Sequence, residues 1–127
     1  MKNMSSAILN RKLRKFSEEL FATHRRSNKL PATIIGAEHR EIKEVDHSGK
    51  VPAPLCVKLT NELIKIGPLG AKGIDNYIGC CCEVRASNKI IQKRLSIPIK
   101  DIIFTRALRP RTGQIIRRCQ NCRQVFG

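Results

Sequence analysis

Residues 78–95 read IGCCCEVRASNKIIQKRL, and this stretch indicates both the fold and the chemistry to expect. It contains the pattern Cys81-x-Glu83, and a second pattern, Cys119-x-x-Cys122, lies near the C-terminal end. Together they supply three thiols for one metal ion and one carboxylate that is not needed as a ligand. Three protein ligands leave the fourth position of zinc open for water, whose pKa the metal lowers to about 7. We therefore expect Zn²⁺ bound by the three cysteines, with Glu83 carrying protons.

The segment that follows these cysteines predicts a helix. Residues 83–95 contain no Gly or Pro, and their apolar residues recur on one helical face. Cys81 is therefore expected at a helix N-terminus, with Glu83 in the first turn. A second helix that begins near Cys119 would point its own N-terminus at the same metal. The positive ends of two helix dipoles favour thiolates there.

The three contiguous cysteines, 80–82, leave other interpretations open. One of three can satisfy Cys-x-Glu by chance. Cys80 or Cys82 could also join the C-terminal pair in a closed structural zinc site, although such a site would have no use for Glu83. Disulfides are a further alternative in a secreted domain. The spacing favours a metal and a reducing compartment.

Further motifs surround the two cysteine patterns. A hairpin from Ile34 to Gly49 precedes an apolar helix over 55–66, and the turn Arg109-Pro110-Arg111-Thr112-Gly113 precedes Cys-x-x-Cys. In this order the motifs resemble the deaminase domains of bacterial polymorphic toxins, a branch of the cytidine deaminase-like superfamily. The resemblance covers roughly residues 32–127. It departs at Arg118, where many members have a proline that suits the first turn of a helix.

The resemblance implies a three-layer α/β/α cytidine deaminase-like sandwich with a central mixed sheet. It implies a zinc-dependent hydrolytic deaminase that converts a nucleobase, cytosine to uracil, within a nucleic acid. It also implies a toxin effector that acts in the cytoplasm of a target cell after secretion as part of a longer protein, opposed by a cognate immunity protein. Residues 32–127 would form the deaminase domain, and residues 1–31 a basic amphipathic helix or a linker.

The remaining chain predicts alternating helices and strands, which is typical of an α/β fold with helices on both faces of a sheet. Glycine-rich residues 67–79 predict a loop that forms a wall of the substrate pocket. The expected elements are a helix from Ser5 or Ser6 to about Arg25, strands over Thr33–Ala37 and Ile42–Asp46, a helix over 54–66, and a central strand over Ile97–Leu108.

The charge indicates the partner. The chain has 25 Lys and Arg against 10 Asp and Glu, a net charge of +15, which suits a polyanion such as DNA or RNA. No acidic residue follows Asp101, and Tyr77 could stack on an extruded base. The alternative is a solvated basic surface that keeps the protein soluble. The expected phosphate-binding residues around Cys-x-x-Cys are Arg106, Arg109, Arg111, Arg117, Arg118 and Arg123.

Two other functions fit the same composition. One is a nonenzymatic nucleic-acid-binding module with a structural zinc, and the other is a deaminase of free nucleosides or nucleotides. A single strand is the favoured substrate, because a duplex requires extrusion of the base. No stretch is long and apolar enough to span a membrane, and the N-terminus lacks the apolar region of a secretory signal.

Overall fold

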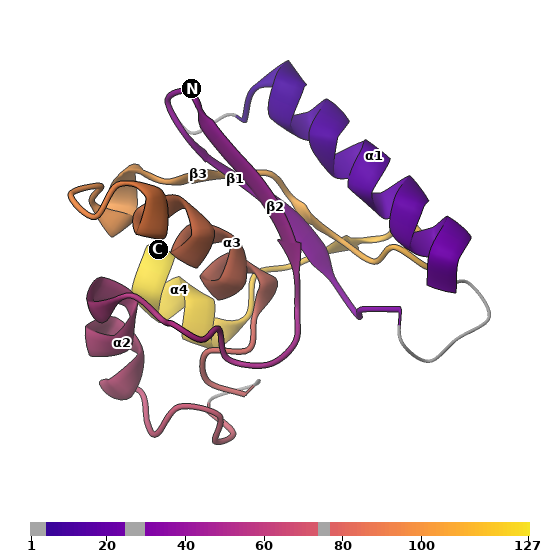
Figure 1. Ribbon diagram of the computed structural model, residues 1–127. Helices are drawn as coiled ribbons and strands as arrows, with labels where there is room; N and C mark the ends of the chain where they lie inside the picture. Colours follow the sequence, from indigo (N-terminus) through magenta and orange to yellow (C-terminus); the bar gives the residue numbers. More distant parts are fainter. Residues whose placement is uncertain (1–4, 25–29, 74–76) are drawn as a thin grey trace.

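A computed structural model describes residues 5–24, 30–73 and 77–127 of the chain. Four α-helices and five strands occur within these residues, together with one short 3₁₀ helix (Figure 1). In chain order they are α1 (Ala7–His24), β1 (Ile34–His39), β2 (Ile42–His47), α2 (Val57–Ile64), α3 (Cys82–Lys93), η1 (Ile99–Asp101), β3 (Ile103–Phe104), β4 (Ala107–Leu108), β5 (Ile115–Ile116) and α4 (Gln120–Phe126).

The hairpin of β1 and β2 is the longest part of the sheet. The two strands pair over six residues, from Ile34 opposite His47 to His39 opposite Ile42. The strand order is β2-β1-β4-β5, and β3 pairs with β1. Every pairing among the described strands is antiparallel, so the prediction of a mixed sheet is wrong. Short turns join β1 to β2 and β4 to β5, and such connections allow only antiparallel neighbours.

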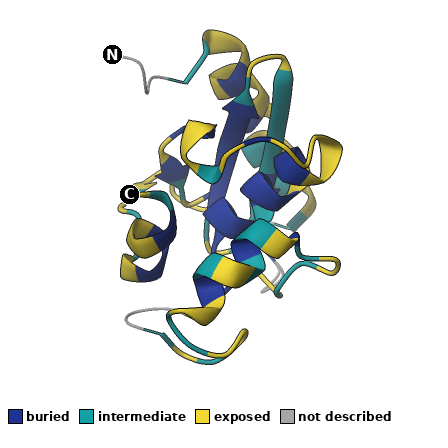
Figure 2. Cartoon of the chain, turned by 90° about the vertical axis from the view of Figure 1, so that its left-hand side faces the viewer, coloured by how far each residue is buried: buried dark blue, intermediate teal, exposed yellow. Residues whose placement is uncertain are grey.

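The two faces of β1 contact different helices, because successive side chains of a strand point to opposite faces. Ile35 and Ala37 belong to the main apolar core, with residues of α2, α3 and α4. Gly36 and Glu38 face α1 instead. Figure 1 shows α1 on one side of the hairpin and the other three helices on the opposite side, and Figure 2 shows the buried strand between them. The fold is therefore a mixed α/β fold with helices on both sides of the hairpin.

Helix α1 packs directly on the sheet. Leu9 is fully buried, and its Cδ1 atom lies 3.0 Å from the position that a Cβ would take at Gly36, so the glycine allows a close approach of α1. Ser6 caps the helix, because its Oγ accepts the Leu9 N–H at 3.1 Å. The Ser6 hydroxyl also donates to Glu38 Oε1 at 2.8 Å, and the Ser6 N–H donates to Oε2 at 2.6 Å. These contacts join the N-terminal helix to β1.

A Ser6→Ala substitution should lower the free energy of unfolding by about 0.5–2 kcal/mol, because it removes the cap and one partner of the buried Glu38 carboxylate. Urea denaturation measures the loss. Ser5→Ala is the matched control, since among the described residues the Ser5 hydroxyl bonds to the exposed Asn10 side chain rather than to the sheet. Equal stability of the two variants would show that the contact between Ser6 and Glu38 does not stabilise the docked helix.

The long strand predicted over Ile97–Leu108 is wrong. The segment instead contains η1 and the two-residue strands β3 and β4. Pro98 stands at the N-cap of η1, where its missing N–H costs nothing, whereas a central strand would need that donor. Ile97 and Ile102 are buried in the core, so the apolar run reflects packing rather than strand pairing.

The other predicted elements agree with the structure within a few residues. The helices expected over 54–66 and 83–95 are α2 and α3, and α1 extends to His24. The predicted end near Arg25, and residues 74–76 of the glycine-rich loop, lie outside the described residues. Within the described ranges, no helix is both long and apolar enough to cross a membrane.

Candidate metal centre

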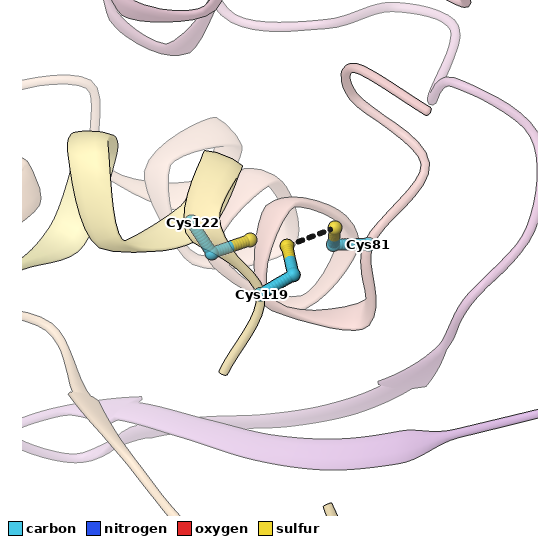
Figure 3. Close-up of side chains that lie close together, drawn as sticks. All are labelled: Cys81, Cys119 and Cys122. Atoms are coloured by element: carbon cyan, nitrogen blue, oxygen red, sulfur yellow. Dashed lines mark hydrogen bonds between the residues drawn. The ribbon is translucent and has the colours of Figure 1, made fainter. Parts of the chain in front are cut away.

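Two helix N-termini meet at the cysteines of the sequence motifs. Cys81 is the N-cap of α3 and Cys119 the N-cap of α4, and both have extended backbone conformations. Backbone N–H groups of Asn121 and Cys122, in the first turn of α4, stabilise a thiolate at Cys119. Cys122 projects from the first turn of α4 toward the other two residues (Figure 3). The predicted positions of Cys81 and Cys119 at helix N-termini are confirmed.

The three sulfur atoms form a compact cluster. Cys81 Sγ and Cys119 Sγ are 3.0 Å apart, and all three sulfurs lie within 4.8 Å of one another. Sulfurs on a tetrahedral zinc would be roughly 3.8 Å apart, since a Zn–S bond is about 2.3 Å long. Cys81 and Cys122 are buried and Cys119 is half-buried. The cluster has the ligand type, the spacing and the shielding from water to hold a metal ion.

Hydrogen bonds within the cluster give its three thiols different acidities. The thiols of Cys122 and Cys81 stabilise the thiolate of Cys119 and hold its pKa far below the usual range. The same hydrogen bonds to Cys119 raise the pKa of Cys122 and of Cys81. Metal binding requires thiolates, so a bound ion must release protons from the cluster. The shared hydrogen bonds therefore favour a thiolate within the cluster.

Glu83 lies beside the cluster in the first turn of α3 and is only 4% exposed. Its Oε1 accepts from the Cys82 thiol at 3.3 Å and from the Cys122 thiol at 3.8 Å. Its Oε2 lies 3.8 Å from Arg118 Nε. Burial raises the pKa of Glu83 above its usual range. A carboxyl group with a raised pKa is better suited to take up and return protons near neutral pH.

The other cysteines do not join the cluster. Neither Cys80 nor Cys82 belongs to the metal-binding group that the described residues form, and the Cys82 thiol is directed at Glu83 instead. Cys56 is buried in the core, as the sequence predicts. None of the six cysteines forms a disulfide in the structure. The geometry therefore favours three protein ligands over four.

Two neighbouring cavities lie beside the cluster. A cavity of about 70 Å³, here called the small cavity, is lined by Cys81, Glu83 and Cys119, together with Thr33 and four other side chains. A larger cavity of about 800 Å³, here called the site cavity, shares four lining residues with it. The shared residues are Glu83, Ala107, Ile116 and Arg117. Glu83 therefore stands between the thiols and a space of the size usual for small-molecule sites.

The structure divides the predicted substrate-binding residues. Four of the six arginines line the site cavity: Arg106, Arg117, Arg118 and Arg123. Arg109 and Arg111 do not line it and belong to the turn between β4 and β5. Tyr77 is 55% exposed, forms a bridge with Lys72, and lines neither the site cavity nor the small cavity.

No motif in the sequence indicates which residues hold Arg118 in place. Its guanidinium carbon lies 5.2 Å from the centre of the Phe104 ring, and Phe126 packs edge-on against that ring. Arg118 Nη1 also donates to the Gly127 carbonyl at 2.7 Å. Phe104 occupies a two-residue strand with no motif around it, so only the folded chain brings it to the site. Arg118 therefore places a cation next to Glu83.

No protein-family model, curated protein or solved structure matches this chain. A function must therefore be inferred from its own residues.

Proposed function

We propose that this protein is a zinc-dependent hydrolytic deaminase of a nucleobase carried in a nucleic acid, with cytosine as the base and a single strand as the preferred form. One observation carries the proposal. Three clustered thiols stand beside a buried carboxyl group, Glu83, that is not part of the cluster and that opens on an arginine-lined cavity. A structural metal site would need neither the carboxyl group nor the cavity.

Hydrolytic deamination adds water at the ring carbon that bears the amine and expels ammonia, so a C–O bond forms and a C–N bond breaks. A zinc ion held by Cys81, Cys119 and Cys122 would supply a Lewis acid and lower the pKa of water. Glu83 accepts a proton from the water, passes it to the adjacent ring nitrogen, and assists departure of the amine. Its raised pKa supports this role, because the same group must accept and donate in one cycle.

The fold is compatible with this chemistry. Helices cover both sides of the hairpin, which supports a three-layer α/β/α sandwich like that of the cytidine deaminase-like superfamily. Its sheet would be antiparallel rather than mixed. The two helix N-termini that present Cys81 and Cys119 also stabilise negative charge on the metal ligands.

The charge supports a nucleic acid over a free nucleoside. Four arginines line the site cavity, and a nucleoside carries no phosphate for them to bind. The net charge of +15 also suits the acidic surface of an immunity protein. We accordingly propose that the protein is a toxin effector that acts in the cytoplasm of a target cell and is neutralised by such a partner.

Ammonia release from defined substrates tests the proposal. The purified protein should release ammonia from a cytosine-containing single-stranded oligonucleotide, and sequencing of mixed DNA and RNA after incubation should show cytosine-to-uracil changes. The rate should fall with rising salt, because phosphate contacts release counterions. Equal, salt-independent rates on the free nucleoside would favour a nucleoside deaminase. Absence of ammonia from every base-containing substrate would favour a binding module with a structural metal.

A further inference from the structure

A second cavity adjoins the site cavity and has one wall on helix α1. This α1 groove has a volume of about 560 Å³ and is lined by Leu13, Arg14 and Glu18 of α1 and by residues around β4 and β5. It shares Arg106 and Ile115 with the site cavity. The two hollows are therefore adjacent, and one exposed arginine and one exposed isoleucine separate them.

The combined surface is strongly basic. Five arginines line the two cavities, against two glutamates, and one of these, Glu83, is close to Arg118. The cations are spread from α1 to the C-terminal helix, so a single phosphate could not contact them all. Such a distribution suits an elongated ligand with repeated negative charges. The lining arginines are Arg14, Arg106, Arg117, Arg118 and Arg123.

We propose that the site cavity and the α1 groove bind one continuous single strand of nucleic acid. This inference rests on the proposed function, which brings the target base to Glu83. The neighbouring nucleotides then cross Ile115, which is 53% exposed and offers an apolar surface to a base or sugar. Arg14 and Arg106 bind the phosphates in the α1 groove. Helix α1 thereby belongs to the substrate-binding surface.

A single strand fits this path better than a duplex. The two cavities together run from the buried Glu83 carboxyl group outward to the exposed side of α1. This course suits one nucleic-acid backbone whose target base enters the site cavity. A duplex would have to extrude the target base, at a cost of a few kcal/mol. Single strands avoid that cost, and an apolar contact such as Ile115 can accept any base.

Fluorescence anisotropy with a labelled single-stranded oligonucleotide of about 12 nucleotides tests the groove, with DNA and RNA of the same sequence as separate arms. Arg14→Ala should weaken binding about tenfold at low salt and reduce the salt slope by about one. Glu18→Gln should tighten binding, because it removes the acidic residue of the groove. Lys12→Ala is the matched control, since the Lys12 ammonium donates to the Lys43 carbonyl on the β2 side of α1.

The outcomes distinguish failure of the groove proposal from failure of the deaminase proposal. If Arg14→Ala binds as tightly as Lys12→Ala, or if the duplex binds at least as tightly as the single strand, the groove proposal is wrong. If Arg14→Ala weakens binding but the parent protein releases no ammonia, the groove stands and the deaminase proposal fails. If the parent deaminates oligonucleotides and Arg14→Ala does so at the same rate, the deaminase proposal is supported and the groove proposal is wrong.

Discussion

A Glu83→Gln variant should keep its fold and its metal but lose at least about 10²–10⁴-fold in deamination rate, the usual contribution of general acid–base catalysis. Glutamine has nearly the same shape and can still accept hydrogen bonds from Cys82 and Cys122 in this buried position. It cannot carry a proton from water to the base. The measurement is ammonia release per bound metal, with metal content determined on the same sample.

Glu62→Gln is the matched control, because Glu62 is a helical glutamate paired with Lys65 and lines neither the site cavity nor the small cavity. It should be as active as the parent. A Glu83→Gln variant that retains both metal and full activity would exclude Glu83 as the proton carrier. A variant that loses the metal would show instead that Glu83 is a ligand.

Cys122→Ser should remove the metal and the activity together. Elemental analysis should find one zinc per parent chain. The variant should bind zinc more than about 100-fold more weakly, because loss of a ligand costs more affinity than loss of a residue that only contacts a ligand. Zinc at 100 times its dissociation constant should stabilise the parent by about 2.7 kcal/mol, and a chelator should reverse this gain. Thermal denaturation with and without zinc measures the difference.

Cys80→Ser is the control for this experiment, since Cys80 adjoins Cys81 in sequence but lies outside the cluster. It should keep zinc and activity. X-ray absorption can count the sulfur ligands of the bound ion. Three sulfurs and one lighter ligand are expected, whereas four sulfurs would identify a closed structural site and contradict the catalytic interpretation.

The positions of Cys81, Cys119 and Cys122 at two helix starts could be predicted from sequence, because the Cys-x-Glu and Cys-x-x-Cys spacings place these residues in the first turn of a helix. Helices α3 and α4 begin where the motifs predict, since a cysteine in extended conformation precedes each of them. Their contact with one another is a tertiary property. It could be expected only because one metal needs all three thiols, and the structure confirms that these thiols lie together.

The strand assignments beyond the hairpin could not be made correctly. Strands β3, β4 and β5 have two residues each, which is too short for an alternating pattern to be recognised. Which arginines line the site cavity also depends on the course of the chain through these short strands. Arg109 and Arg111 follow β4 in a turn and do not line the site cavity, although they are closer in sequence to Cys119 than Arg106 is.

Gly36 determines how closely α1 approaches the sheet. A Cβ at this position would lie 3.0 Å from Leu9 Cδ1 and 3.0 Å from Thr105 Cγ2, so a larger residue would press on Leu9 of α1 and on Thr105, and either must give way by a few tenths of an ångström. Because α1 forms one wall of the α1 groove and the β4–β5 region the other, displacement of the helix would widen the groove. The width of a surface groove is thus set by a residue in the interior that contacts no ligand.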